Sequence, residues 1–189
     1  KQIIKDLHNK IYRPIYLLMG EEPYFIDEIT NYIANHVLTE EEKAFNQVVY
    51  YGKDTDVGTI INAAKRYPMM ANHQVIIVKE AQALKDFDTL IHYIKRPLTS
   101  TILVLSYNYK SLDKRRKIYT AFEKNALVFE SKKLYENEIP DWINHYVKRR
   151  SISIEAKAAA ILTEYLGTDL RKIANELEKL AILVPENEL

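Results

Sequence analysis

The chain has 189 residues, of which 47% are hydrophobic and 28% are charged, and its formal net charge is +1. These values fit a globular protein with one large domain, or one domain plus a small one, and argue against an overall strongly basic nucleic-acid binder. The absence of cysteine excludes disulfides, thiolate zinc sites and a cysteine nucleophile, and fits a reducing cytosol. No apolar run reaches the roughly 18 residues that cross a bilayer, so we expect a cytoplasmic protein without a membrane partner.

The first two thirds of the sequence alternate between strand-like and helix-like segments. Short apolar runs predict five strands, at residues 15–19, 47–51, 74–79, 101–106 and 126–130. Helical stripes between them predict helices, among them one capped by Thr55, one that carries Leu84, Phe87, Leu90, Ile91 and Ile94, and a charged one from about 112 to 124. This alternation predicts an α/β fold with a parallel five-stranded sheet that helices cover on both faces.

After residue 131 the strand signals stop. Three helical stripes follow, and the first is expected to begin at Asn137 as its N-cap. The change from alternating elements to helices alone predicts a domain boundary. We therefore expect an α/β domain at residues 1–133 and a small all-helical domain at residues 134–189.

The turn after the first strand is a frequent phosphate site in parallel α/β sheets. A P-loop there has the pattern G-x-x-x-x-G-K-S/T, in which glycine amides surround the phosphates, lysine neutralises them and the hydroxyl binds magnesium. Here Gly20 is followed by Glu21, Glu22 and Pro23, and the second glycine, the lysine and the hydroxyl are missing. The pattern predicts a nucleotide-binding fold that has lost its site and takes no cofactor, although a sheet unrelated to P-loop proteins would also fit.

Other catalytic patterns are weak in this sequence. The five histidines lack metal-ligand spacing, and no G-x-S-x-G nucleophile motif occurs. Lys79, which ends the third strand, and Glu80, one position further on, would be the residues of an unorthodox ATPase. We expect no catalytic and no metal-binding residue.

The segment before the third strand is unusually apolar for a turn. It contains Tyr67, Pro68, Met69 and Met70, where polar residues are expected. Two adjacent methionines cannot both enter a core from a short turn, and the flexible thioether suits the groove of a partner. The pattern predicts either contact with another macromolecule or methionines that fold back onto the edge of the sheet.

Five segments, in order along the chain, resemble the delta subunit of bacterial DNA polymerase III in a Bacteroidetes-type version. They are YLLMGEEPYFIDE at 16–28, PMMANHQVIIVKEA at 68–81, STILVL at 100–105, NYKSLDKRRK at 108–117 and GTDLRKIANELEKL at 167–180. Together they extend over nearly the whole chain. The resemblance implies an ATPase-like (AAA+) α/β domain and a helical lid, followed in the family by a helical collar domain that is absent here.

The resemblance also implies a non-catalytic clamp-loader subunit. Members of the family bind the sliding clamp and help to open it on primed DNA, while sister subunits hydrolyse ATP and are contacted mainly through the collar. Their clamp-binding element is a hydrophobic pair, Leu-Phe in better-known members, and Met69 and Met70 stand at the matching positions beside Tyr67 and Pro68. Arg171 stands in the nucleotide-sensing segment of the lid, where it would make a structural ion pair or close the interdomain cleft.

A basic run follows the fourth strand and extends into the expected charged helix. Its members are Lys110, Lys114, Arg115, Arg116 and Lys117. Such a run predicts a solvated helix face. The alternative is contact with the phosphates of primer-template DNA, which would depend steeply on salt.

Overall fold

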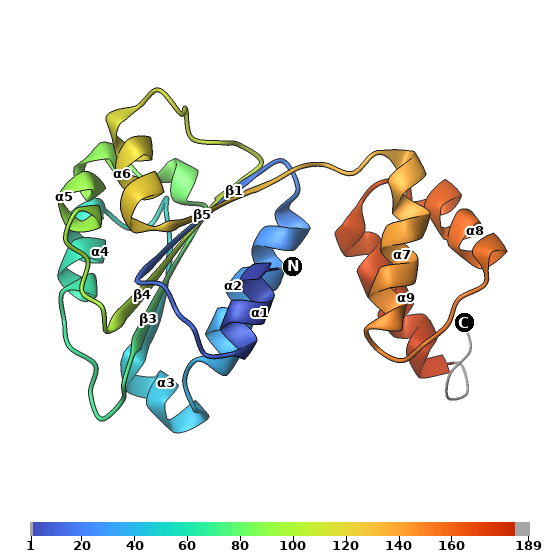
Figure 1. Ribbon diagram of the computed structural model, residues 1–189, viewed down its shortest axis with the longest axis horizontal. Coiled ribbons are helices and arrows are strands. Elements are labelled where there is room, and N and C mark those ends of the chain that lie inside the picture. Colours follow the sequence, from blue (N-terminus) through green and yellow to red (C-terminus); the bar gives the residue numbers. More distant parts are fainter. Residues whose placement is uncertain (1, 184–189) are drawn as a thin grey trace. The chain divides into compact units, whose positions relative to one another are not determined.

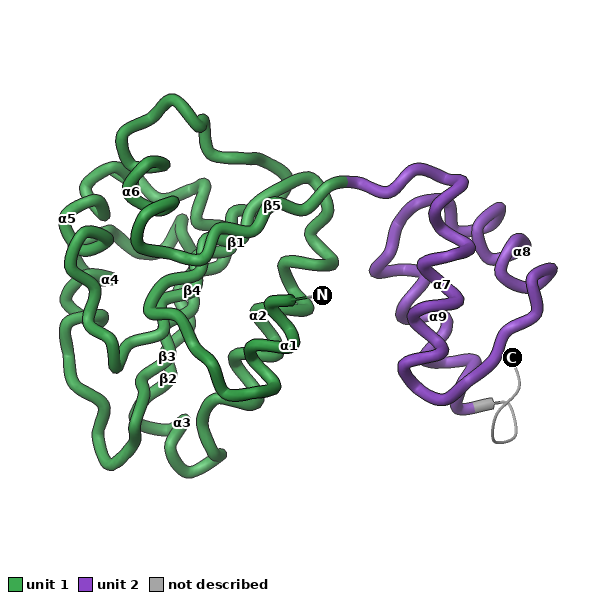
Figure 2. Tube along the Cα trace, viewed as in Figure 1, with its two compact units in different colours: residues 1–132 green, residues 133–189 purple. Residues whose placement is uncertain are grey.

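The computed structural model describes residues 2–183. The chain divides into two compact units, residues 1–132 and residues 133–189 (Figure 2). The first unit alternates strands and helices, and the described part of the second consists of helices (Figure 1). None of the described helices is both long enough and apolar enough to span a membrane.

The first unit is built on a five-stranded sheet in which all neighbouring strands are parallel. Its strands are β1 (Ile15–Gly20), β2 (Gln47–Tyr51), β3 (Gln74–Lys79), β4 (Thr101–Asn108) and β5 (Leu127–Ser131). Their order across the sheet is β2-β3-β4-β1-β5, so that Leu17 in β1 lies opposite both Leu105 and Val128. β1, β3 and β4 are buried along most of their length, as a sheet covered on both faces requires. The predicted fold class is confirmed.

Helices form the outer layers of this unit, as Figure 1 shows. On one face lie α1 (Gln2–His8) and α2 (Pro23–His36), and on the other lie α4 (Val57–Ala64), α5 (Ile91–Ile94) and α6 (Lys117–Asn125). Because successive strand residues point to opposite faces, Leu17 and Met19 join one core while Tyr16 and Leu18 join the other. The short helix α3 (Glu40–Asn46) leads directly into β2.

The helix expected around residues 84–94 is broken in the structure. Two 3₁₀ turns, η1 (Ala81–Ala83) and η2 (Phe87–Leu90), precede the single turn of α5. Glu80 and Asp86 have left-handed backbone conformations, with φ of 53° and 52°, and such residues interrupt a right-handed helix. The apolar stripe is nevertheless largely buried, although the regular helix does not form.

Two predicted helix caps were also wrong. Asp56, not Thr55, caps α4, because its Oδ1 accepts a hydrogen bond from the Thr59 amide at 2.9 Å. The N-cap of the next helix is Glu138 and not Asn137, one residue later than expected. The preceding turn η3 (Glu136–Glu138) leads into α7 (Ile139–Lys148), which has a proline in its first turn.

The second unit contains α7, α8 (Ala156–Leu166) and α9 (Leu170–Leu183). Its core includes Ile143 from α7, Ala159 from α8 and Ile173 from α9. Tyr146 donates a hydrogen bond to Glu178 at 2.9 Å, and burial together with this bond raises the pKa of Tyr146 to about 12. These contacts join the first helix of the unit to the last.

Candidate functional site

The turn after β1 is closed against the last residue of β5. The amide of Glu21 donates to the carbonyl oxygen of Ser131 at 3.2 Å, and the amide of Glu22 donates to the Ser131 hydroxyl, also at 3.2 Å. The amide of Gly20 donates to the carbonyl oxygen of Lys110 at 3.0 Å. The backbone donors that would face a phosphate in a P-loop are therefore engaged within the protein.

Glu22 occupies the N-terminus of α2. Its side chain is only 6% exposed and accepts a hydrogen bond from the Tyr24 amide at 3.0 Å, while Pro23 provides the first helical residue without an amide proton. A helix N-terminus attracts anions through its dipole and its free amides. Here the anion is a carboxylate of the protein itself, so this turn would oppose a phosphate rather than hold one.

Removal of this internal cap tests that interpretation. Glu22→Ala is expected to lower the free energy of unfolding by about 1–2 kcal/mol, because α2 loses its N-cap acceptor. Urea denaturation measures this loss, with Glu21→Ala as a control because the side chain of Glu21 is exposed. A fluorescent ATP analogue should show no saturable binding to either variant, and saturable binding by Glu22→Ala would mean that the carboxylate alone blocks a working site.

The segment that resembles a nucleotide sensor connects α8 to α9. Gly167 ends α8 with a φ of 64°, and Asp169 accepts a hydrogen bond from the Lys172 amide at 3.1 Å at the start of α9. Arg171 lies exposed in the first turn of α9. Its role as an ion-pair partner or in cleft closure stays a prediction. Within the described residues, no cluster of three or more His, Cys, Asp or Glu side chains could hold a metal ion.

The apolar segment before β3 is displayed to solvent. Met70 is 97% exposed, Met69 is 59% exposed and Tyr67 is 78% exposed, while Pro68 is half-buried. Met70 also has a φ of 54°, in the left-handed region. Of the two alternatives for this segment, the one in which both methionines fold back onto the edge of the sheet is therefore wrong.

The base of this turn is fixed by polar side chains in the core. The side-chain nitrogen of Gln74 lies 2.7 Å from the Thr101 hydroxyl and also within hydrogen-bond distance of the Arg66 carbonyl oxygen. The hydroxyls of Thr101 and Tyr93 both donate to the carbonyl oxygen of Ala64, at 2.9 and 3.2 Å. These bonds satisfy backbone groups at the end of α4 and hold the point where the turn begins.

The tip of the turn is bound by Asn46, the last residue of α3. Its Oδ1 accepts from the Met69 amide at 2.6 Å, and its Nδ2 donates to the Met69 carbonyl oxygen at 2.9 Å. No local pattern in the sequence marks this residue, because its partner lies 23 positions away. The apolar pair is thus part of a structure built from two separate segments.

The charged helix expected from about residue 112 begins only at Lys117, where α6 starts, so most of the basic run is not helical. Asp113 Oδ1 accepts from the Arg115 amide at 2.9 Å, a local turn that competes with helix formation. Leu112 is buried and so draws the segment onto the body of the unit. The run therefore lies mainly on a loop.

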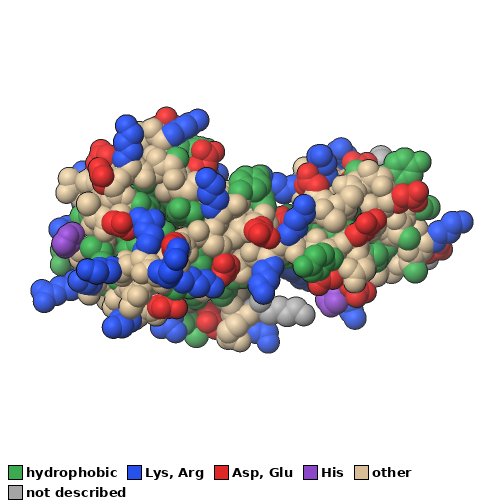
Figure 3. All heavy atoms as spheres, turned by 90° about the horizontal axis from the view of Figure 1, so that it is seen from above, with side chains coloured by type: hydrophobic (Ala, Val, Ile, Leu, Met, Phe, Trp, Pro, Cys, Tyr) green, Lys and Arg blue, Asp and Glu red, His purple; other side chains and the backbone are tan. Residues whose placement is uncertain are grey.

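Three of the five basic side chains have carboxylate partners. The pairs are Lys114–Glu130 at 2.8 Å, Arg115–Asp113 at 2.7 Å and Arg116–Asp88 at 2.6 Å. The hydrogen bond from Arg115 is the main reason that the pKa of Asp113 falls to about 2. Figure 3 shows Lys and Arg side chains interspersed with Asp and Glu on the face it presents. Contact with DNA phosphates stays a prediction, with less unpaired positive charge than the sequence suggests.

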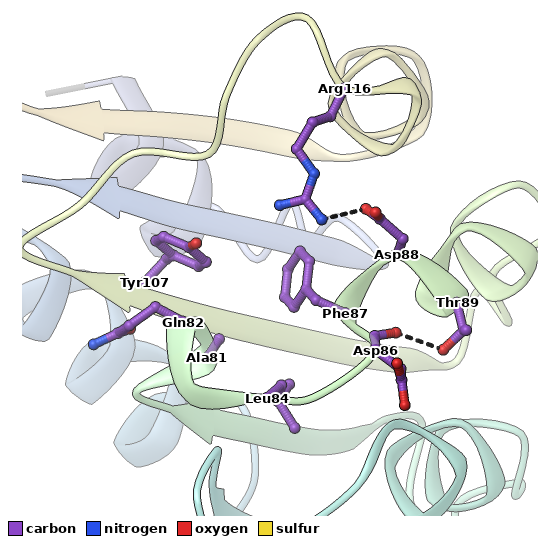
Figure 4. A pocket seen from close by; sticks show the side chains of 9 residues that line it. All are labelled: Ala81, Gln82, Leu84, Asp86, Phe87, Asp88, Thr89, Tyr107 and Arg116. Atoms are coloured by element: carbon purple, nitrogen blue, oxygen red, sulfur yellow. Dashed lines mark hydrogen bonds and ion pairs between the residues drawn. The ribbon is translucent and has the colours of Figure 1, made fainter.

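An open cavity of about 320 Å³ lies where β3 and β4 end (Figure 4). Phe87 and Tyr107 form its apolar part, and the Arg116–Asp88 ion pair stands at its side. Asp86 adds a second carboxylate, so the charged side chains around the cavity are two acids and one base. This balance does not suit a phosphate ligand.

Comparisons with known proteins agree with the resemblance of the five segments. The sequence model of the family described as "DNA polymerase III, delta subunit" matches residues 16–132. The DNA polymerase III subunit delta of Bacillus subtilis (strain 168) is 28% identical over 194 residues, which cover 97% of this chain and 56% of that protein. The solved structure of the Bacillus subtilis DNA clamp loader delta protein has a TM-score of 0.79 at 26% identity, over 100% of this chain and 59% of that one.

The chain thus spans a little over half the length of these two relatives. The family match itself extends over more than half of the chain and includes all of the sheet except Ile15. This chain belongs to the DNA polymerase III delta subunit family.

Proposed function

We propose that this chain acts within a clamp loader, where it binds the sliding clamp through the turn that carries Met69 and Met70 and helps to open it. Family membership supports the assignment to a clamp loader. The exposed turn supplies a surface of the right chemistry, because a small apolar group that enters a pocket of the partner is the usual form of a binding hot spot.

The backbone of Met70 is the observation that carries this proposal. A left-handed conformation costs a residue with a Cβ about 1–2 kcal/mol, and glycine would remove that cost. Met70 has this conformation while its large apolar side chain is 97% exposed, so the side chain contributes little burial to folding. Strain combined with apolar exposure marks functional surfaces.

The structure of the turn also suits tight binding. Its base is fixed by Gln74 and its tip by Asn46. A turn that is ordered before association loses less conformational entropy when it binds. Clamp opening then requires the chain to bind a distorted clamp interface more tightly than the closed one, because a ligand shifts an equilibrium only through such a difference.

We further infer that this chain does not hydrolyse ATP. The amides of Glu21 and Glu22 bind Ser131, and the carboxylate of Glu22 occupies the N-terminus of α2. The pattern lacks the lysine and the hydroxyl that bind phosphate and magnesium. In this proposal the energy for release of the clamp comes from other subunits of the loader.

Calorimetric titration of the purified sliding clamp with this chain tests the proposal. The chain should bind, and Met70→Gly should bind at least about tenfold more weakly because the anchor is lost. Urea denaturation should show a free energy of unfolding for Met70→Gly within about 1 kcal/mol of the unsubstituted chain, because glycine accepts the left-handed backbone. No binding by the unsubstituted chain would refute the function, and full binding by Met70→Gly would place the contact elsewhere.

A further inference from the structure

Among residues 67–73, Met69 alone hydrogen-bonds to other parts of the described chain (residues 2–183), and its partner is Asn46. The two bonds engage both the amide and the carbonyl of Met69. The turn is anchored before this stretch at Arg66 and after it at Gln74. The tip therefore hydrogen-bonds to other elements through one side chain, while Ala71 packs against the core and the ring of His73 lies against that of Tyr12.

The amide of Asn46 is well suited to this role. Asn46 is only 5% exposed, and the second N–H of its side chain donates to the carbonyl oxygen of Glu42 at 3.0 Å. Both hydrogens and the oxygen are thus in use, and exchange of the oxygen and nitrogen positions would place donor against donor at the Met69 amide. One orientation of the side chain satisfies all partners, so Asn46 sets the backbone of Met69 in one position.

The helix that carries Asn46 is itself firmly defined. Thr39 and Glu42 form a reciprocal capping box, with bonds of 2.9 and 3.3 Å, at the start of α3. At its other end α3 continues without a loop into β2, which is paired with β3 in the sheet. The position of Asn46 is therefore tied to the sheet through covalent bonds and a short helix.

We propose that Asn46 is a positioning residue for clamp binding, which fixes Met69 so that Met70 keeps its left-handed backbone and projects from the protein. This inference rests on the proposed function of the turn. A strained backbone persists only where its surroundings over-determine it. Without the two bonds from Asn46, the tip can relax to other conformations, and the binding-competent one becomes a fraction of the population.

Asn46→Ala should lower the affinity for the purified sliding clamp roughly tenfold in calorimetric titration. The matched control is Asn125→Ala. Asn125 is also the last residue of its helix and also bonds the carbonyl oxygen four residues earlier, that of Ala121, at 3.0 Å. Its side-chain hydrogen bond stays within its own helix, so its loss should lower stability without lowering affinity. Hydrogen exchange at the Met69 amide should be faster in Asn46→Ala and unchanged in Asn125→Ala.

A mutant cycle separates positioning from a general loss of structure. Asn46→Ala should cost much less affinity in a chain that already carries Met70→Ala, because the side chain of Met70 that Asn46 positions is then missing. Asn46→Asp provides a second variant of nearly the same size. It keeps an acceptor for the Met69 amide but sets a carboxylate against the carbonyl oxygens of Met69 and Glu42, so it should also bind the clamp more weakly.

The outcomes distinguish this inference from the function on which it rests. If the unsubstituted chain does not bind the clamp, the proposed function is wrong. If it binds, and Met70→Ala weakens binding while folded Asn46→Ala and Asn46→Asp bind normally, only the role of Asn46 is wrong. An equal loss of affinity from Asn46→Ala with and without Met70→Ala would also overturn positioning.

Discussion

Replacement of Met69 and Met70 together by alanine is expected to lower the affinity for the sliding clamp by about 2 kcal/mol or more, which is roughly thirtyfold. Both side chains are largely exposed in the free chain. Their truncation therefore removes little buried surface from the fold, and the free energy of unfolding should stay within about 0.5 kcal/mol of its original value. A large change in binding with a small change in stability is the signature of a contact surface.

Calorimetry against the purified clamp measures the loss. The matched control replaces Ile161 and Tyr165, two exposed apolar side chains on α8, by alanine, and this variant should bind normally. Binding through the methionines should also change little between low and moderate salt, whereas binding through phosphates would weaken steeply. Equal affinities of the double methionine variant and the unsubstituted chain would exclude this pair as the anchor.

The sheet was predictable because its signal is local and repeated. β2 and β3 have the predicted bounds, β1 and β4 end one and two residues later than predicted, and β5 is shifted by one residue at both ends. Continuous apolar runs of this length suit strands buried on both faces. The region after β3 was less predictable, because Asp86, a left-handed residue, interrupts a stripe that otherwise has helical spacing. A left-handed conformation at one residue does not change the spacing of the apolar residues, so the sequence pattern cannot reveal it.

The candidate site was predictable only in part. The composition of the turn marked Met69 and Met70 as unusual, but the left-handed backbone of Met70 has no sequence signal. The supports of the turn were missed for a similar reason. Asn46 reads as an ordinary helix end and Gln74 as a polar strand start, and their importance arises from partners that lie 23 and 27 residues away, Met69 and Thr101.

The same limit applies to the basic run. Its residues suggest one charged helix, yet their partners Glu130 and Asp88 come from segments that are distant in sequence. Pairing of this kind lowers the net charge that a nucleic acid would meet. The number of basic residues in a run is therefore a poor measure of its electrostatic field until the opposing carboxylates are known.

Gly20→Ala is expected to destabilise the first unit by at least about 3 kcal/mol. Gly20 has a φ of 130°, which residues with a Cβ rarely adopt, and a Cβ there would lie 2.1 Å from the carbonyl oxygen of Ser131 and 2.6 Å from its amide nitrogen. These are backbone atoms of β5, so relief of the clash requires the end of β1 to move away from β5. The bonds from Glu21 and Glu22 to Ser131 would be lost with that movement.

Gly167→Ala is the matched control for this substitution. Gly167 also has a positive φ, 64°, but an added Cβ there meets no atom within 4 Å. Its φ of 64° and ψ of −137° lie outside the left-handed helical region, so Gly167→Ala should cost backbone strain alone, about 1–3 kcal/mol. This is less than the combined strain and crowding at Gly20, and urea denaturation of both variants separates the two effects. A larger loss from Gly20→Ala than from Gly167→Ala would mean that the close approach of β5 requires a glycine at position 20. The glycine in this turn is then explained without a bound nucleotide. Equal losses from the two substitutions would show that crowding against Ser131 contributes nothing and that the turn can open to admit a ligand.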